Sequence, residues 1–310
     1  MSISLKQTSL PLVFHPDYTI TLPKGHRFPM EKYSKILQIL LNDGVVSKDS
    51  IFTPKPANRN ELCIAHNKDY IDAVFNNKLD SSAERLLGFK CNKTIVKRAR
   101  AAVGGTILAA RLALKYQIAC NTAGGSHHGH PGHAAGFCIF NDVAVAVKVL
   151  QKQSIIHKAL IIDLDVHQGD GTACFFSCDP TVFTFSIHCE TNYPDKKKRS
   201  DMDFGLPQGT GDDTYLDCLR KNLPIAISKA QPDIVFLNAG VDPHIDDKLG
   251  KLNLSNNGLL ARDLSTLDLC QKSKIPVACV LGGGYSDDLN ELAQKHTTIH
   301  RAAKMVLNSE

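Results

Sequence analysis

Two carboxylates and an imidazole alternate along one short segment of the sequence. Asp163, Asp165 and His167 are separated by Leu164 and Val166. In a strand, alternate residues share a face, so the three polar side chains would point the same way. Side by side they repel one another and lose solvation unless a cation lies among them. The segment therefore favours a metal site over an exposed strand end that carries solvated acids.

A third ligand is available at the end of another apolar run, where Asp242 closes the segment 238–242. Asp165 and His167 would supply one oxygen and one nitrogen, and Asp242 a second oxygen. Three protein ligands with an open fourth position are typical of catalytic rather than structural zinc. Because two carboxylates cancel the charge of the ion, its water would be less acidic, and a separate base would be needed.

The adjacent pair His127-His128 is predicted to supply that base. The pair lies in a glycine-rich segment, and two imidazoles in series make poor core filler because each needs its own partner. Each ring also needs an orienting group, and Asp163 and Asp170 are the carboxylates left over after metal binding. We expect Asp163 to pair with His127 and Asp170 to pair with His128.

Three more side chains complete the polar set. His130 and His133 lie on the loop beyond the histidine pair, and we interpret them as surface or rim residues rather than ligands. Tyr285 follows three glycines at 282–284, which let the backbone turn sharply near a ligand. Three glycines alone usually form a turn, but here they place a phenol where it can donate to an oxygen that develops negative charge.

Competing motifs fail on spacing. Segment 124–128, Gly-Gly-Ser-His-His, resembles a serine-hydrolase elbow, but His128 replaces the closing glycine of Gly-x-Ser-x-Gly. The sequence contains no Gly-x4-Gly-Lys-Ser/Thr phosphate loop and no deaminase-type Pro-Cys-x-x-Cys.

These residues stand at the ends of short apolar runs that alternate with amphipathic stretches. Strands with nearly continuous apolar character, as in strands covered on both faces, are predicted at 158–166, 181–188, 233–240 and 276–284. Two more strands are predicted, one at 118–122 and one at the sheet edge at 12–14. Helices are predicted at 30–41, 68–75, 94–116, 141–152, 212–229 (broken near Pro224), 255–271 and 286–306. The alternation predicts a single α/β domain over 1–310 with a parallel sheet, and ligands bind at the carboxyl ends of such strands.

Composition excludes several classes of protein. The 310 residues show no linker or repeat, and no apolar run approaches the roughly 18–20 residues that a membrane-spanning helix requires. The N-terminus lacks the cleavage pattern of a secretory signal. A net charge of +5 is too small to predict nucleic-acid binding, and we interpret the basic run at 196–199 as a solvated loop rather than a phosphate-binding patch.

Cysteine usage predicts the compartment. The 10 cysteines are scattered through apolar or helical stretches and contain no Cys-x-x-Cys. Reduced thiols in a cytoplasmic protein fit this pattern best, or in a nuclear protein if the source is eukaryotic.

With these motifs in place, the chain resembles the zinc-dependent histone deacetylases of the arginase/deacetylase superfamily. The matching blocks are LVFHPDYTITLPKGHRFPMEKY (12–33), GGSHHGHPGHAAGFCIFND (124–142), LIIDLDVHQGDGT (160–172), LNAGVDPHIDDKLGKLNLS (237–255) and LGGGY (281–285). The similarity covers nearly the whole chain and looks most like the class IV and bacterial branch. It implies one three-layer domain around a mostly parallel eight-stranded sheet with helices on both faces.

The resemblance implies hydrolysis of N-acyl-lysine, with an acetyl or longer acyl group, to a carboxylate and a free amine. The zinc ligands are those predicted above, and iron(II) in the cell stays an alternative. Carried over by motif, His128 is the general base and then acid, His127 assists electrostatically, and Tyr285 holds the oxyanion together with the zinc.

The resemblance also implies a tunnel and a second ion. Gly136 and Phe137 would line the tunnel for the acyl-lysine stem, with Tyr193 as the facing wall and Leu249 near the rim. A potassium ion would be bound by carbonyls around Asp163, Asp165, His167 and Ser186. Many relatives carry an aspartate in a rim loop that grips the substrate backbone; Lys90 takes that position here, which places recognition of a histone-like peptide in question.

Several alternatives stay open. One is a small-molecule deacylase such as an acetylpolyamine amidohydrolase, and the class IV likeness makes long-chain acyl-lysine an option as well. Another is a catalytically silent module that recognises acylated partners. A binuclear manganese hydrolase of the arginase type is disfavoured, because segment 163–171 lacks the further Asp and His residues that a second metal needs. No direct nucleic-acid partner is expected, and the oligomeric state is not predicted.

Overall fold

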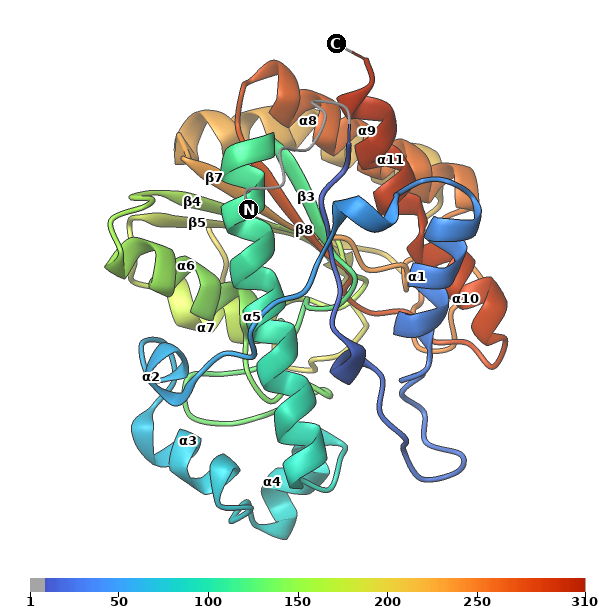
Figure 1. The fold of residues 1–310 in the computed structure, drawn as a ribbon. Coiled ribbons are helices and arrows are strands. Elements are labelled where there is room, and N and C mark those ends of the chain that lie inside the picture. Colours follow the sequence, from blue (N-terminus) through green and yellow to red (C-terminus); the bar gives the residue numbers. More distant parts are fainter. Residues whose placement is uncertain (1–8, 310) are drawn as a thin grey trace.

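Eight parallel strands form one sheet at the centre of the protein (Figure 1). The structure is a computed structural model that describes residues 9–309. The strand order is β2-β1-β3-β8-β7-β4-β5-β6, and every pairing between neighbours is parallel. The strands are β1 (Leu12–Val13), β2 (Ile51–Phe52), β3 (Ile118–Asn121), β4 (Ala159–Asp163), β5 (Val182–Cys189), β6 (Met202–Leu206), β7 (Ile234–Asn238) and β8 (Val277–Val280). The predicted α/β class and eight-stranded sheet are confirmed.

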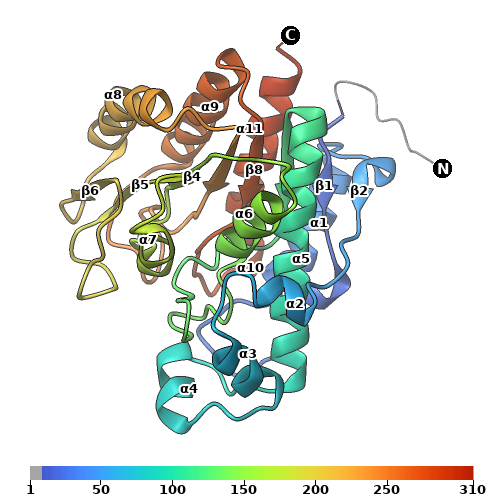
Figure 2. The ribbon, with the colours of Figure 1, turned by 90° about the vertical axis from the view of Figure 1, so that its left-hand side faces the viewer.

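Helices cover both faces of this sheet. One layer contains α5, α6 and α7, and the other contains α8, α9 and α11 (Figure 2). The helices are α1 (Lys32–Asn42), α2 (Arg59–Leu62), α3 (Lys68–Phe75), α4 (Ser81–Leu87), α5 (Lys93–Tyr116), α6 (Asp142–Lys152), α7 (Asp170–Phe176), α8 (Asp212–Ala230), α9 (Asn256–Lys272), α10 (Leu289–His296) and α11 (Thr298–Leu307). Strands β3, β4, β7 and β8 are buried along their whole length, which explains their unbroken apolar runs.

Three predicted elements differ from the structure. The strand at 12–14 is not at the edge, because β2 pairs with its outer side; two residues are too short a run to be noticed in the sequence. The helix α8 passes through Pro224 without a break, since burial of Leu219, Leu223 and Ala226 offsets the hydrogen bond that proline removes. The predicted helix at 286–306 is divided at Thr297, which separates α10 from α11.

The parallel arrangement brings the carboxyl ends of all strands to one edge of the sheet. The loops that leave this edge contain the polar residues singled out above, and α2, α3 and α4 lie beyond it (Figure 1). Among the described residues, no helix has the length and apolar character to cross a membrane. The predicted domain span 1–310 includes residues 1–8 and 310, which lie outside the described residues. Residues 1–8 also belong to the N-terminal segment 1–18, for which no secretory signal is predicted.

Candidate active site

The three predicted metal ligands meet at the carboxyl edge of the sheet. Suitable donor atoms of Asp165, His167 and Asp242 all lie within 4.8 Å of one another, and all three residues are buried. The Nδ1 atom of His167 lies 3.0 Å from Oδ1 of Asp165 and 3.1 Å from Oδ2 of Asp242. The strand β4 already ends at Asp163, so Asp165 and His167 stand on the loop that follows rather than on the predicted strand face.

Backbone donors fix both carboxylates of this set. The amides of Gly283 and His167 donate to Asp165 over 2.6 and 3.0 Å, and the amide of Val166 donates to Asp242 over 2.9 Å. Burial and the charge of Asp165 raise the pKa of Asp242 to about 7. Burying two carboxylates beside an imidazole costs solvation free energy unless a cation lies among them. The carboxylate oxygens and the imidazole nitrogen are ligand atoms of the kind that divalent zinc prefers. The residues therefore fit a single divalent metal ion.

Each histidine of the adjacent pair has its own carboxylate, as predicted. Nδ1 of His127 lies 2.7 Å from Oδ2 of Asp163, and Nδ1 of His128 lies 2.6 Å from Oδ1 of Asp170. Burial lowers the pKa of His127, but the charges of Asp163 and Asp165 outweigh it and raise this pKa to about 9. Burial and the neighbouring His127 lower the pKa of His128 to about 3. The two rings therefore favour opposite charge states, His127 protonated and His128 neutral.

His130 is not a surface residue, so that interpretation was wrong. Its side chain is buried, and Nε2 lies 2.9 Å from Oδ2 of Asp170, the second oxygen of the carboxylate that binds His128. Burial raises the pKa of Asp170, but the hydrogen bonds from His128 and His130 outweigh it and hold this pKa below its usual range. The loop turns back at 131–132, and of the two histidines His133 is the exposed one, with its ring stacked 4.2 Å from that of His130.

Tyr285 lies beside this set on a loop that is held from both sides. Its amide donates to Oδ2 of Asp247 over 2.7 Å, and its ring centroid lies 6.4 Å from that of His167. Behind the loop, the buried Lys32 donates to the carbonyl of Gly284 over 3.5 Å and lies 3.0 Å from Nε2 of His296. Burial raises the pKa of Tyr285 well above its usual value, so the phenol stays protonated and can donate a hydrogen bond.

A cavity of about 380 Å³ leads from the surface to these residues. All four predicted tunnel residues line it: Gly136, Phe137, Tyr193 and Leu249. Phe137 adopts a φ of 66°, and its amide and that of Gly136 donate to the carbonyls of Leu87 and Leu86 at the end of α4. These bonds fix one wall of the tunnel to α4.

The opposite wall is formed by Tyr193, whose ring lies 4.8 Å from the ring of His128. Leu249 stands beside it, because Nδ2 of Asn192 donates to the Leu249 carbonyl over 2.7 Å. Polar groups thus stand at the floor of the tunnel, and apolar side chains form its walls.

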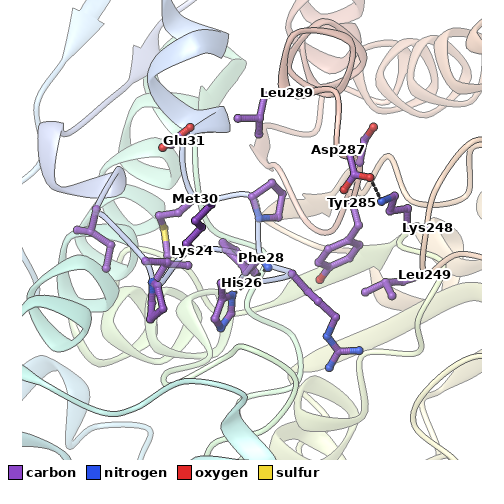
Figure 3. A pocket seen from close by; sticks show the side chains of 17 residues that line it. Lys24, His26, Phe28, Met30, Glu31, Lys248, Leu249, Tyr285, Asp287 and Leu289 are labelled. Atoms are coloured by element: carbon purple, nitrogen blue, oxygen red, sulfur yellow. Dashed lines mark hydrogen bonds and ion pairs between the residues drawn. The ribbon is translucent and has the colours of Figure 1, made fainter.

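A second cavity of about 570 Å³ adjoins the tunnel (Figure 3). Tyr285 and Leu249 border both spaces, and His26, Phe28 and Met30 of the segment before α1 form the far side of the second one. Across its rim, Lys248 forms an ion pair with Asp287.

Lys90 does not line the tunnel. It is exposed and borders a neighbouring groove of about 730 Å³, which shares Arg85 and Gly88 with the tunnel cavity. Two arginines that the sequence analysis did not single out, Arg27 and Arg85, line the tunnel cavity instead. For the implied potassium ion, the structure shows that Asp163 and Ser186 are register partners on β4 and β5; the ion itself stays a prediction.

Three residues that support the site were not predicted. Nδ2 of Asn238 donates to Asp163 over 2.9 Å, and Asp247 accepts the Tyr285 amide. Asn238 and Asp247 lie at or after the end of an apolar run, and this position in the sequence could have marked them as site residues. Arg262 of α9 is fully buried and donates to the carbonyls of Leu164 and Gly240 over 3.1 and 2.7 Å, which ties together the two loops that bear the metal ligands. No motif marks Arg262.

Comparison with known proteins identifies the family. The histone deacetylase domain matches residues 26–301. The chain belongs to the histone deacetylase family. It is 48% identical over 296 residues to an uncharacterized protein of Picosynechococcus sp., with 96% of this chain and 99% of that protein covered. It is 31% identical to the acetoin utilization protein AcuC of Staphylococcus aureus over 76% of this chain and 66% of that protein.

Solved structures agree with this assignment. A histone deacetylase homologue from Aquifex aeolicus matches with a TM-score of 0.81 and 26% identity over 97% of this chain and 89% of that one. A homologue of this kind has also been solved in complex with SAHA, and it matches with a TM-score of 0.80. The protein is therefore a hydrolase of the histone deacetylase family, with an arginase-type α/β fold and a site suited to a metal ion. The likeness to class IV stays a prediction.

Proposed function

We propose that the protein is a zinc-dependent hydrolase that removes an acetyl or longer acyl group from the side-chain amine of acyl-lysine. The observation that carries this proposal is the convergence of three metal ligands, two His–Asp pairs and a protonated tyrosine at the floor of the tunnel cavity. Family membership supports the hydrolase class.

Asp165, His167 and Asp242 would hold the divalent ion, which we propose to be zinc, with iron(II) as the alternative in the cell. When bound, the ion would polarise the acyl carbonyl and make a water molecule more acidic. Potassium at the carbonyls around Asp163, Asp165, His167 and Ser186 would add a structural ion next to this centre.

His128 is the proposed general base. Because Asp170 occupies its Nδ1, the Nε2 atom is the one left to take a proton from the attacking water and return it to the departing amine nitrogen. Burial and the neighbouring His127 lower the pKa of His128, so the ring is neutral before the reaction and its Nε2 has a free lone pair. One amide bond breaks, the hydroxyl of water joins the acyl carbon, and the amine leaves with the transferred proton.

His127 and Tyr285 act on the charge that develops during this step. His127, held protonated by Asp163, stabilises negative charge near the reacting carbon. The Tyr285 hydroxyl donates to the oxygen of the tetrahedral species. Gly136, Phe137, Tyr193 and Leu249 enclose the methylene stem of lysine and exclude bulk water.

An acyl-chain panel with defined metal content tests the proposal. Protein loaded with one equivalent of zinc should release amine from acetyl-, octanoyl- and myristoyl-lysine peptides, and His128→Ala should lower kcat by about 10²-fold or more. Exposed His157, far from the tunnel, provides the control variant His157→Ala, which should keep the wild-type rate. Wild-type turnover in His128→Ala, or no hydrolysis with any acyl length, would contradict the proposal.

A further inference from the structure

The mouth of the tunnel is positively charged. Arg27 and Arg85 line the tunnel cavity, and among the described residues no Asp or Glu does. Arg27 also borders the second cavity, where Glu31 and Asp287 are the acidic residues. Arg27 comes from the segment before α1 and Arg85 from α4, so the two side chains approach the cavity from separate elements. Both arginines are exposed.

Neither guanidinium is used by the protein itself. Within residues 9–309, no hydrogen bond or ion pair joins Arg27 or Arg85 to another group. Lys248 is paired with Asp287, and the Glu84 carboxylate, next to Arg85 in the sequence, accepts the amide of Cys91 over 2.8 Å. The two arginines therefore have all their donors available to a ligand.

The backbone at both arginines is fixed to the tunnel wall. His26, just before Arg27, bonds the carbonyl of Gly88 over 3.0 Å and stacks on Phe89 at 4.9 Å. Phe28, just after it, packs edge-on against Phe137 at 5.4 Å. Arg27 is thus held at the mouth by its neighbours on both sides.

Arg85 is held in the same way. The carbonyls of Leu86 and Leu87, directly after it, accept the amides of Gly136 and Phe137, which line the tunnel. Because the backbone is anchored at both arginines, binding a ligand costs only the rotamer entropy of the two side chains.

The basic run at 196–199 adds charge of the same sign. It follows Tyr193, and the Lys197 ammonium donates to the carbonyl of Pro194 over 2.7 Å, which ties the run to the tunnel wall. One acid, Asp195, precedes four basic residues there. The segment 24–31 before α1 and the basic run therefore each carry a positive excess, whereas in α4 Glu84 balances the charge of Arg85.

We infer that the substrate carries a carboxylate close to the acylated amine, and that Arg27 and Arg85 bind it at the tunnel mouth. This inference rests on the proposed function and narrows its substrate class. Guanidinium groups bind carboxylates through paired, charge-assisted hydrogen bonds. Acylated polyamines and lysine-rich segments would instead bring positive charge to a positive mouth and be disfavoured. The carboxylate has two chemical sources, the side chains of acidic neighbours in a peptide or the α-carboxylate of free acyl-lysine.

Three acetyl-lysine peptides of equal length, with flanking residues Asp, Ser or Lys, test this inference. At low salt, kcat/KM for the acidic peptide should exceed that for the basic peptide by about tenfold, as two exposed ion pairs allow. At 0.5 M NaCl the ratio should shrink toward one. Free Nε-acetyl-lysine and its methyl amide form the second arm: a preference for the free acid identifies the α-carboxylate, and equal rates with a retained peptide preference identify the acidic neighbours.

The double variant Arg27→Gln/Arg85→Gln should bring the acidic-to-basic ratio close to one. Arg220→Gln, on the exposed side of α8, is the matched control and should keep the wild-type ratio. Equal kcat/KM for all three peptides in the wild type together with equal rates for free Nε-acetyl-lysine and its methyl amide, or a preference that survives in the double variant, would overturn the inference.

Fluorescence anisotropy with the same labelled peptides and the His128→Ala protein separates this inference from the proposed function. Tighter binding of the acidic peptide, lost in the Arg27→Gln/Arg85→Gln background, supports the inference even if no peptide is hydrolysed. Equal affinity for acidic and basic peptides, with no difference between free Nε-acetyl-lysine and its methyl amide as competitors, overturns it even if hydrolysis is observed.

Discussion

The floor and the mouth of the tunnel are built on opposite principles. At the floor, the histidines and aspartates are buried and paired: Asp163 with His127, and Asp170 with both His128 and His130. At the mouth, Arg27 and Arg85 are exposed and have none among the described residues. The floor is organised before any substrate arrives, whereas the mouth keeps its donors for the substrate.

The difference in burial sets the size of every expected effect. Buried charges interact in a medium of low effective dielectric constant, where losing one partner leaves another group unsatisfied. Exposed charges are screened by water and salt, so each contributes little. We therefore expect large, salt-independent changes from substitutions at the floor and small, salt-dependent changes at the mouth.

Tyr285→Phe should give the largest effect among the residues that are not metal ligands. Loss of the hydroxyl removes a donor to the developing oxyanion, so kcat should fall by about 10²–10³-fold. The metal content should stay at the wild-type level, because Tyr285 is not part of the Asp–His–Asp set. A change in kcat of less than about threefold, measured with metal content confirmed, would remove Tyr285 from the mechanism.

Asp170 and His130 allow a graded test of the floor. Asp170→Asn cannot hold His128 as a carboxylate does, and kcat should fall by about 10²-fold. His130→Gln removes only the bond to the second oxygen of Asp170, so the loss should be about tenfold or less and the acidic limb of the pH–kcat profile should move. If the His130→Gln profile superimposes on that of the wild type, His130 is a packing residue only.

His66 should make folding stability fall in acid. Its Nε2 accepts the Asn141 amide and its Nδ1 bonds the His130 carbonyl, which requires a neutral ring, and burial lowers its pKa to about 4. The unfolded chain takes up this proton near pH 6.5, so the stabilisation is complete above pH 6.5 and is lost as the pH falls toward 4.

Urea unfolding at pH 6.5 and 5.0 measures this effect. Between these values the wild type should lose about 2 kcal/mol more than His66→Gln, whose amide can replace both hydrogen bonds without titrating. Parallel losses in the two proteins would show that His66 does not contribute to acid sensitivity.

Single substitutions at the mouth should give the smallest effects. Arg85→Gln alone should lower kcat/KM for the acidic peptide by about threefold at low salt and leave no difference at 0.5 M NaCl. If kcat/KM stays lower at 0.5 M NaCl, Arg85 interacts with the substrate without screening, as a buried group does. The proposed difference in salt dependence between mouth and floor would then be wrong.

The floor was predictable from sequence because each residue follows an apolar run that reads as a buried strand. To predict that Asp163, Asp165 and Asp242 lie together, it is enough to know that parallel strands end at one edge of the sheet. His130 was misplaced, because nothing in the spacing shows that the loop turns back to the second oxygen of Asp170.

The mouth was not predictable for a different reason. Arg27 and Arg85 are 58 residues apart in the sequence, and neither follows a predicted strand. Both line the same cavity because hydrogen bonds join the end of α4 to the loop that contains Phe137. Arg262 was hidden in the same way, since an arginine inside an amphipathic helix reads as a solvated side chain. Alignment by motif placed Lys90 at the rim, and the structure places it on a groove that shares Arg85 and Gly88 with the tunnel cavity.

The most direct test of the central claim is the metal content of the wild-type protein and of the Asp242→Asn variant. Both proteins are dialysed against trace zinc, and the bound metal is measured by inductively coupled plasma mass spectrometry. The account predicts one tightly held divalent ion per wild-type chain and less than about a tenth of that in the variant, with hydrolysis lost in parallel. A wild-type protein that hydrolyses acyl-lysine without bound metal, or an Asp242→Asn protein that keeps its full complement, would contradict the account.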